Sequence, residues 1–405
     1  MTPVSCQQIP FECGAKRMTS SRARSIAILG ATGSIGRSTL EVVEASQGRF
    51  KAAGLTANSS LKQLCEQAAR FAPKWVVATS PQESASFDWS VLPEGVEVSV
   101  GQEGIERLVT QPEIDVVVSA VVGSVGLRGT WAALEAGKTV ALANKETLVM
   151  AGPLVMRLAA ERGTAVLPID SEHSAVFQAM QAGRRNDVKR IILTASGGPF
   201  RRYTSQQMAQ VTVEQALAHP TWDMGPKITV DSATMMNKAL EIVEARWLFD
   251  LPADQIDVVV HPQSIVHSMV EFLDGSVVAQ LSPPDMKLPI QYALSYPERW
   301  PGPAEKLDFR GCFHLDFEPP DLGRFPALGL GFEVARSGGT AGAVLNAANE
   351  AAVAGFLDGR LAFNQIVPVC RSVLQHHEFD ANPDLEQLIQ LDNWARREVT
   401  RWSCS

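Results

Sequence analysis

Side chains able to do chemistry gather in one short stretch, residues 231–241, which reads Asp-Ser-Ala-Thr-Met-Met-Asn-Lys-Ala-Leu-Glu. Most of its polarity falls where a helix would start, and spacings of three and four place Asn237, Lys238 and Glu241 on one helix face. Near a helix N-terminus, such a face can hold an anion and a cation side by side. A capped, solvated helix start is the alternative, and Asp231 is expected to be a structural cap.

Two more carboxylates follow a strand pattern at residues 164–170. Along an extended chain, alternation places Asp170 and Glu172 on the same side. Two such carboxylates repel each other unless a cation lies between them, and oxygen ligands of this kind suit Mg²⁺ or Mn²⁺. The adjacent His173 is expected to support a ligand or cap a helix rather than bind the metal itself. Helix capping is the alternative explanation for the whole unit.

A glycine-rich turn, Gly-Ala-Thr-Gly-Ser-Ile-Gly at residues 30–36, separates an apolar run at 25–29 from a helical pattern at 37–44. Strand, glycine turn and helix in this order let a pyrophosphate approach the helix N-terminus, where free N–H groups point outward. The turn therefore predicts dinucleotide binding, and its GxxGxxG spacing is a variant typical of NADP enzymes.

The second strand, expected at residues 50–56, bears on the choice of cofactor. An NAD site needs Asp or Glu at the end of this strand to bind the ribose 2′-hydroxyl, and no acidic residue occurs within residues 50–63. Small polar residues at 57–60 and the nearby Lys62 and Arg37 leave room for a 2′-phosphate, so NADP is predicted. The alternative is that this loop only caps the next helix.

The elements that must position these residues alternate in type. Strand and helical patterns follow each other from residue 75 to residue 143, which predicts a doubly wound parallel sheet. The last of these strands runs directly into Asn144, Lys145 and Glu146, and ligands bind at the carboxyl ends of such strands. Alternatively, Lys145 and Glu146 only cap the following helix.

Two loops rich in glycine and proline are candidates for ligand contact. Residues 195–200, Ala-Ser-Gly-Gly-Pro-Phe, offer a hydroxyl and free N–H groups to a phosphate, although an ordinary turn has the same composition. Residues 219–226 carry Trp222 at their centre, which predicts a lid that excludes water from a ligand. Packing of His219 and Trp222 between domains is the alternative.

The second half of the chain should contain an antiparallel hairpin and a helical bundle. Residues 258–271 and 276–281 alternate as two strands, with His261 and His267 on one face but too far apart to bind zinc. Such a half-covered sheet could serve as a dimer surface. Three helical patterns predict a small C-terminal bundle, at residues 340–356, 363–376 and 384–398.

The expected fold class is α/β, with a doubly wound NADP-binding domain, an α+β catalytic domain whose sheet is partly antiparallel, and a C-terminal helical bundle. The expected boundaries are a disordered leader at residues 1–24, an NADP-binding Rossmann-like domain at 25–165, a catalytic and dimerisation domain at 166–310, a linker at 311–330 and a helical domain at 331–405.

Composition excludes several classes of function. The net charge of -8 argues against a nucleic-acid binder, and no apolar run reaches the roughly 18 residues that span a bilayer. The six cysteines are scattered singly without a CxxC pair, so neither a zinc site nor a disulfide framework is expected. For the leader, an upstream start before Met18 with a disordered tail is expected, and a transit-peptide remnant is the alternative. The expected compartment is the bacterial cytoplasm, with the plastid stroma as the alternative.

Taken together, the motifs resemble the 1-deoxy-D-xylulose 5-phosphate reductoisomerase family of the non-mevalonate isoprenoid pathway. The resemblance covers residues 25–400 and rests on motifs in one order: 30–36, 141–146, 169–173, 195–200, 230–238 and 261–267. It implies a homodimer that uses NADPH and one divalent cation, Mg²⁺, Mn²⁺ or Co²⁺. It also implies that a phosphorylated sugar is rearranged, by retro-aldol cleavage and re-aldol joining, and then reduced to 2-C-methyl-D-erythritol 4-phosphate.

The resemblance also assigns roles to individual residues. Those implied to bind the metal are Asp170, Glu172 and Glu241. Those implied to contact the substrate are Lys145, Ser171, Glu172, Ser196, His219, Ser232, Asn237, Lys238 and Glu241, of which Lys145, Glu172, Glu241 and His219 are the implied catalytic set. Those expected at the cofactor are Thr32, Gly33, Ser34, Ile35, Ser59, Asn144, Glu146 and Gly225. His267 is implied to lie near the substrate, without an assigned proton transfer.

One departure concerns residues 57–60, Ala-Asn-Ser-Ser, where many family members have Ala-Gly-Lys-Asn or Ala-Gly-Ser-Asn. The change affects recognition of the 2′-phosphate but brings in no acidic residue. Two other functions fit parts of the pattern. A semialdehyde or homoserine dehydrogenase would share the architecture, although its thioester-forming subclass needs a cysteine and none lies between Cys65 and Cys312. A non-catalytic NADP sensor would need no carboxylate trio.

Overall fold

The computed structural model describes residues 22–222, 224–312 and 314–402. The expected leader, with its start before Met18, falls largely on residues 1–21, outside the described residues, and the first strand begins at Arg24. Among the described residues, no helix combines the length and apolar character that crossing a bilayer requires.

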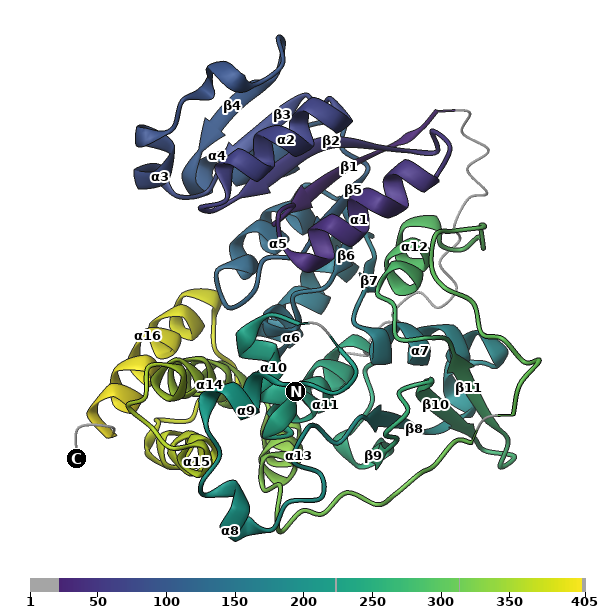
Figure 1. Cartoon of the computed structure of the whole chain (residues 1–405), viewed down its shortest axis with the longest axis vertical. Coiled ribbons are helices and arrows are strands. Elements are labelled where there is room, and N and C mark those ends of the chain that lie inside the picture. The colour runs from purple at the N-terminus through teal and green to yellow at the C-terminus, as the bar shows by residue number, and fades with distance from the viewer. Residues whose placement is uncertain (1–21, 223, 313, 403–405) are drawn as a thin grey trace, which may run out of the picture.

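A seven-stranded, wholly parallel sheet forms the first part of the molecule, with strand order β4-β3-β2-β1-β5-β6-β7 (Figure 1). The strands are β1 (Arg24–Leu29), β2 (Phe50–Ala57), β3 (Trp75–Ala78), β4 (Glu97–Val100), β5 (Val116–Ser119), β6 (Thr139–Leu142) and β7 (Val166–Pro168). The helices between them are α1 (Ser34–Ala45), α2 (Leu61–Phe71), α3 (Pro81–Ser86), α4 (Gly101–Val109), α5 (Gly126–Glu135) and α6 (Lys145–Arg162). The doubly wound parallel sheet is confirmed.

Both faces of this sheet are buried, because alternate residues of its central strands enter two different cores. Ala27 and Leu29 of β1 pack with residues of α4 and α5, whereas Ile26 and Ile28 pack with residues of α1 and α2. The second face is completed by α12 (Lys287–Ser295), a helix that the sequence patterns did not reveal and that lies beside α1 in Figure 1. A distant segment thus joins the first sheet to the rest of the chain.

A second sheet has four strands in the order β11-β10-β8-β9. Its strands are β8 (Val188–Ala195), β9 (Ile256–Val260), β10 (Val266–Phe272) and β11 (Val277–Leu281). The hairpin β10–β11 is antiparallel, as expected, but the single strand expected at 258–271 is wrong. The chain turns between Val260 and Val266, where Ser264 has a φ of 52°, so His261 lies in the turn and does not share a strand face with His267.

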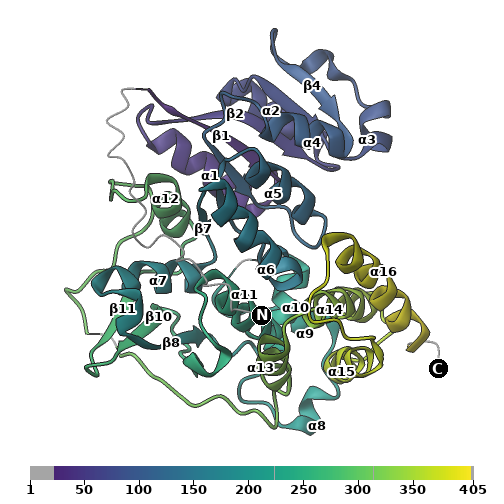
Figure 2. The same cartoon turned by 180° about the vertical axis from the view of Figure 1, so that it is seen from behind.

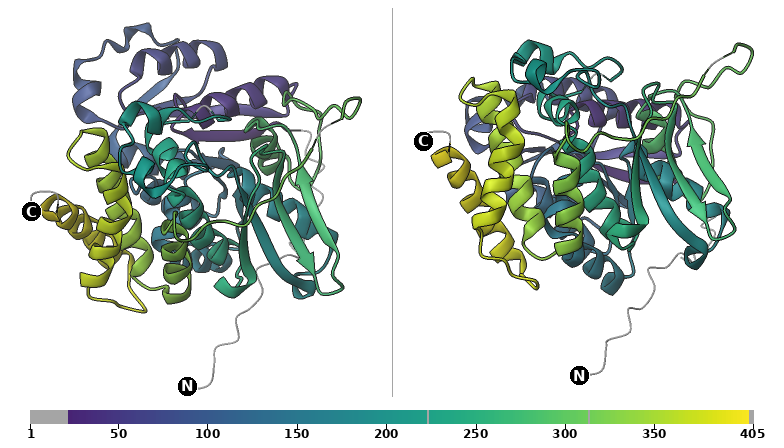
Figure 3. Two further views of the ribbon diagram at one scale, coloured as in Figure 1. Left: turned by 60° about the horizontal axis from the view of Figure 1, so that its bottom comes forward. Right: turned by 90° about the horizontal axis from the view of Figure 1, so that it is seen from below.

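The other helices after β7 include one that packs on β10 and β11 and those of the C-terminal bundle. They are α7 (Ser171–Ala179), α8 (Ser205–Met208), α9 (Val213–Leu217), α10 (Pro226–Ala233), α11 (Met236–Leu248), α13 (Ala327–Ser337), α14 (Ala341–Leu357), α15 (Ile366–His376) and α16 (Leu385–Trp402). The bundle of α14, α15 and α16 lies on the opposite side of α10 and α11 from β8–β11 (Figures 2 and 3). The three expected C-terminal helices are confirmed.

The stretch 231–241 is divided between two helices. Met235 takes a left-handed conformation, with a φ of 62°, and α11 starts directly after it, so the expected helix start is confirmed. The expectation that Asp231 caps this helix is wrong. Asp231 lies inside α10 and is buried, and its carboxylate accepts a hydrogen bond from Asn349 at 2.8 Å and pairs with Lys227 at 3.0 Å. Its role is to join α10 to α14.

The turn between β1 and α1 depends on Gly36, which supplies one prediction. A Cβ at this position would lie 2.3 Å from the carbonyl oxygen of Gly30 and 2.5 Å from the carbonyl of Ala31, and backbone atoms cannot move aside easily. We expect Gly36→Ala to destabilise the protein by about 2 kcal/mol. We also expect weaker NADPH binding by about tenfold, since about 1.4 kcal/mol of lost contact energy has that effect.

Thermal unfolding and NADPH fluorescence titration would measure the two effects of Gly36→Ala. Gly329→Ala is the matched control, because Gly329 lies in α13 with open space around it, and alanine is the better helix former. Unchanged NADPH affinity in Gly36→Ala would contradict the proposed role of this turn.

Candidate active site

The carboxylates singled out in the sequence converge. Among the described residues, Asp170, Glu172 and Glu241 each offer an oxygen within 4.8 Å of the others. Asp170 is the N-cap of α7 and accepts the backbone N–H of Glu172 at 3.2 Å, whereas Glu241 comes from α11. The two carboxylates Asp170 and Glu172 lie together, as expected. The expectation that an extended strand places them so is wrong, because the start of a helix brings them together. Capping and membership of the cluster are both true of Asp170.

A second cluster shares Asp170 and adds His173 and Glu244. The His173 ring is held at both nitrogens, with Nδ1 3.2 Å from Asp170 Oδ1 and Nε2 3.0 Å from the carbonyl oxygen of Glu241. The side chains of His173 and Glu244 are buried completely or nearly so, whereas Glu172 keeps 18% of its side-chain surface exposed. Only the trio with Glu172 is thus open to a substrate. In the second cluster, His173 holds Asp170 through its side chain and Glu241 through its backbone carbonyl, on the buried side of the trio.

Two ammonium groups lie among the carboxylates of this trio. Lys145 Nζ is 2.6 Å from Asp170 Oδ2 and 2.9 Å from Glu241 Oε1. Lys238 Nζ is 2.8 Å from Glu172 Oε1 and also contacts Glu241. Buried carboxylates need positive charge nearby, and here two lysines supply it. The three carboxylates therefore offer the oxygen donors and the negative charge that a divalent cation requires, and the two ammonium groups lie where they would compete with such a cation.

The electrostatics of the trio follow from burial opposed by these contacts. Burial disfavours the ionised form of Asp170, but Lys145 and then His173 hold the pKa of its carboxyl well below the usual value. Burial, followed by the charge of Glu172, raises the pKa of Glu241 despite the two lysines. Burial opposes the charged form of Lys145 as well, yet Asp170 and Glu241 raise its pKa well above the ordinary value.

The triplet after β6 contributes to the same region. Asn144 is the N-cap of α6, and its side chain accepts the N–H of Thr147 at 2.9 Å, so capping does not explain Lys145 and Glu146. Glu146 is buried and pairs with Lys227 at 2.8 Å. The carboxyl end of β6 therefore directs Lys145 to the carboxylates and Glu146 toward the start of α10.

The candidate phosphate residues surround the starts and ends of α10 and α11. Ser196 directly follows β8, and its hydroxyl lies 3.2 Å from His219 Nε2 and accepts the N–H of Gly198 at 3.2 Å. Gly198, with a φ of 66°, leaves no room for a side chain, because a Cβ would lie 2.6 Å from the carbonyl oxygen of Ser232. The loop thus packs on the end of α10. Asn237, in the first turn of α11, accepts from Lys145 at 2.9 Å.

The loop expected to act as a lid folds back toward β10. His219 Nδ1 accepts the N–H of Trp222 at 2.9 Å, and the Trp222 ring lies 6.2 Å from the ring of His267, centroid to centroid. Burial lowers the pKa of His267 to about 4, so this histidine is neutral at physiological pH and is a poor general acid there. The low pKa agrees with the expectation that His267 lies near the substrate without an assigned proton transfer.

Several of the expected cofactor residues lie around the glycine turn and the end of β2. Gly30 has a φ of 86°, and its N–H donates to Thr56 Oγ1 at 2.9 Å. Gly33 is the N-cap of α1 and offers no side-chain acceptor, so Ser34 and Ile35 begin a helix whose first N–H groups no capping side chain satisfies. Other expected cofactor residues lie in the turn (Thr32), in an exposed loop after β2 (Ser59) and at the start of α10 (Gly225).

Three family models match successive parts of the chain. Residues 26–152 match the model of 1-deoxy-D-xylulose 5-phosphate reductoisomerase, residues 166–249 its C-terminal domain, and residues 281–398 the DXP reductoisomerase C-terminal domain. The enzyme of that name from Rhodopirellula baltica is 48% identical over 432 residues, covering 94% of this chain and 95% of the relative. The chain belongs to the 1-deoxy-D-xylulose 5-phosphate reductoisomerase family.

Other members of the reductoisomerase family agree. The relative from Heliobacterium modesticaldum is 51% identical, covering 93% of this chain and 97% of the relative. The Zymomonas mobilis reductoisomerase, solved in complex with NADPH, superposes with a TM-score of 0.88 at 44% identity, covering 94% and 99% of the two chains. A DOX-P reductoisomerase in complex with NADPH, fosmidomycin and magnesium gives a TM-score of 0.88 at 41% identity, covering 94% and 98%. The chain is thus an NADP-dependent oxidoreductase, and the resemblance and the fold class are confirmed.

Sequence reasoning missed two charged groups of this reductoisomerase site, the buried Glu244 and the partly buried Lys227. Glu244 lies three residues after Glu241, so a second buried carboxylate on the same face of α11 was a usable signal. Lys227 lies four residues before Asp231, and this spacing, which favours an ion pair within a helix, was the signal for the second group.

Proposed function

We propose that the residues of this site carry out the family reaction, in which 1-deoxy-D-xylulose 5-phosphate is rearranged and reduced to 2-C-methyl-D-erythritol 4-phosphate. The reaction supplies isopentenyl diphosphate precursors in the non-mevalonate pathway. The observation that carries the proposal is the trio of carboxylates from α7 and α11, charge-balanced by Lys145 and Lys238 and joined to a dinucleotide fold. Relatives solved with NADPH, fosmidomycin and magnesium support it.

Asp170, Glu172 and Glu241 would hold one divalent cation, Mg²⁺, Mn²⁺ or Co²⁺. Their oxygens lie close enough together, and the two ammonium groups occupy the positions of positive charge that they demand. When bound, the cation supplies Lewis-acid polarisation of the substrate's carbonyl and hydroxyl oxygens. Lys145 must then release at least one carboxylate oxygen, which leaves its ammonium, with the hydroxyl of Ser171, to donate to substrate oxygens.

The substrate's phosphate would be bound by four residues from the end of β8, from α10 and from α11, namely Ser196, Ser232, Asn237 and Lys238. Lys238 and Glu241 are one turn apart on α11, so this helix fixes the distance between phosphate and metal. His219 contacts Ser196 and carries the loop with Trp222, so its proposed role is to couple phosphate binding to lid closure and to exclude water.

NADPH would bind across the carboxyl ends of the parallel strands. The uncapped start of α1 and the close packing at Gly36 fit a pyrophosphate that contacts Thr32, Gly33, Ser34 and Ile35. Ser59, which follows β2 without any nearby carboxylate in residues 50–63, fits the 2′-phosphate side. Asn144, Glu146 and Gly225 are proposed on the nicotinamide side. When bound, NADPH supplies the hydride.

The assembly and the compartment are also proposals. The edge strand β11 exposes Val277 beside the hairpin, which supports a homodimer formed through this sheet. The relatives named above are bacterial, which supports the bacterial cytoplasm over the plastid stroma. The proposed domains keep their expected limits, although the boundary at residue 165 separates β7 from the parallel sheet and the end of the linker at residue 330 overlaps α13.

An absorbance assay tests the proposal. With 1-deoxy-D-xylulose 5-phosphate and Mn²⁺ present, we expect the absorbance of the reduced nicotinamide to fall as NADPH is oxidised. Omission of the metal, or chelation with EDTA, should abolish the signal, because the carboxylate trio then has only lysines as counter-ions. NADPH binding without metal-dependent oxidation would favour the sensor alternative and contradict the proposal.

A further inference from the structure

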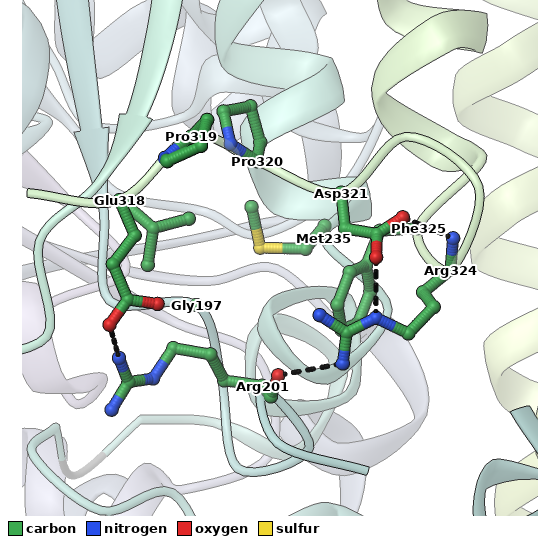
Figure 4. Close-up of a pocket in the computed structure, with 10 residues that line it drawn as sticks. Gly197, Arg201, Met235, Glu318, Pro319, Pro320, Asp321, Arg324 and Phe325 are labelled. Carbon is green, nitrogen blue, oxygen red and sulfur yellow. Dashed lines mark hydrogen bonds and ion pairs between the residues drawn. The ribbon is translucent and has the colours of Figure 1, made fainter. Parts of the chain in front are cut away.

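A narrow cavity lies between residues 318–325 and the loop that follows β8 (Figure 4). One wall is the segment 318–325, which the sequence indicated only as part of a linker and which we call the strap. The opposite walls are Gly197, beside Ser196, and Met235, the residue from which α11 starts. The cavity therefore separates the strap from both elements that present phosphate-binding groups.

The strap is fixed to the second sheet by its first residue. Glu318 and Val260 exchange two backbone hydrogen bonds of 2.9 Å, which extend the sheet by one residue beyond its edge strand β9. Val260 is also paired with Ala195, the last residue of β8. The strap is thereby positioned relative to the strand end from which Ser196 follows.

The side chain of Glu318 binds two arginines that directly follow the loop at residues 195–200, which carries Ser196. Arg201 donates to Glu318 Oε1 at 2.8 Å, and Arg202 donates to the same oxygen at 2.9 Å. The aliphatic part of Arg201 covers Gly197, since a Cβ on that glycine would lie 2.6 Å from Arg201 Cδ. Contacts therefore run without a gap from Glu318 through Arg201 to Gly197, the neighbour of Ser196.

A second connection comes from the other end of the strap. The guanidinium of Arg324 donates to the carbonyl oxygens of Arg201 at 2.9 Å and Tyr203 at 3.0 Å, and Asp321 holds it at 2.7 Å (Figure 4). The strap therefore holds the loop after Gly198 in two ways. Glu318 binds the side chain of Arg201, and Arg324 binds the backbone carbonyls of Arg201 and Tyr203. The other side of the loop presses on Ser232, so a shift of the loop would displace two proposed phosphate ligands together.

We propose that the strap is a positioning element for the phosphate pocket, and that Glu318 is its positioning residue. The proposal rests on the proposed function, because it assumes that Ser196 and Ser232 receive the substrate's phosphate. Glu318 does not touch the substrate. It acts through Arg201, by fixing the loop in the conformation in which the Ser196 hydroxyl is placed for the phosphate.

The test compares three variants with a matched control. Glu318→Ala removes both arginine contacts, Glu318→Gln keeps a side-chain oxygen that can still accept from Arg201, and Arg201→Met keeps the packing on Gly197 without the charge. Asp254→Ala is the control, because it breaks a surface ion pair of 3.0 Å with Arg336, which lies elsewhere in the structure. Each protein is assayed for KM for 1-deoxy-D-xylulose 5-phosphate, KM for NADPH, kcat and inhibition by inorganic phosphate.

We expect Glu318→Ala and Arg201→Met to raise the substrate KM about fivefold and the inhibition constant of inorganic phosphate in parallel, with KM for NADPH and kcat nearly unchanged. Glu318→Gln should recover most of the wild-type KM, and Asp254→Ala should match the wild type. An unchanged substrate KM in Glu318→Ala overturns the proposal. So does a variant in which both KM values rise and kcat falls together with the unfolding temperature, because that result shows a general loss of structure. A wild-type enzyme without metal-dependent NADPH oxidation would instead refute the proposed function.

Discussion

Glu241→Gln is expected to reduce kcat/KM by about 10³-fold while NADPH binding stays nearly intact. Glu241 is the carboxylate that both lysines and Asn237 contact, and it is buried within α11. Glutamine keeps the shape but offers a cation one neutral oxygen in place of a charge. The glycine turn and β2 have no contact with this residue, so the cofactor should bind as before.

Comparison with Glu244→Gln makes this expectation specific. Both residues are buried carboxylates of α11, but Glu244 belongs to the second cluster, behind His173. A group that only orients a ligand typically costs about 10- to 100-fold when removed. Steady-state kinetics and Mn²⁺ titration of both variants would check this. If Glu244→Gln lost more metal affinity than Glu241→Gln, the cation would belong to the second cluster and our assignment would be wrong.

Much of the fold was predictable because local patterns and long-range packing agreed. The parallel sheet is buried on both faces, so its strands are continuously apolar and its glycine turn stands out. The start of α11 was predictable from the polar face of Asn237, Lys238 and Glu241, which survives in the structure as a set of contacts to one cluster.

Other features could not be predicted, since they depend on partners distant in sequence. Asp231 looks like a cap until Asn349, 118 residues away, supplies its hydrogen bond. Helix α12 covers a sheet formed by residues that precede it by more than a hundred positions, and its own sequence carries no sign of that face. The strap has the composition of a linker, and only its pairing with Val260 shows that it is part of the sheet.

Lys238→Met is expected to have opposite effects on two ligands. The variant removes the ammonium that contacts Glu172 and Glu241 and that is proposed to bind the substrate's phosphate. We expect KM for 1-deoxy-D-xylulose 5-phosphate to rise about 100-fold, the size of effect seen when one partner of a buried charge pair is lost. In the absence of substrate, Mn²⁺ should bind more tightly, by roughly thirtyfold, because removal of a like charge about 4 Å from a divalent cation relieves about 2 kcal/mol of repulsion.

The opposite changes in substrate and Mn²⁺ affinity distinguish two roles of the Lys238 ammonium. It either moves between the carboxylates and the phosphate or only stabilises the carboxylates. If Lys238 only stabilised the carboxylates, its loss would weaken the whole site and both affinities would fall together. If it moves from carboxylates to phosphate as the cation binds, its loss helps the metal and harms the substrate. Lys189→Met is the control. Lys189 also pairs with a carboxylate, Glu271 at 2.7 Å, but it lies on the second sheet away from the trio, so its loss should leave both constants unchanged. Weaker Mn²⁺ binding in Lys238→Met would show that the ammonium does not compete with the cation, and α11 would then hold phosphate and metal as separate sites.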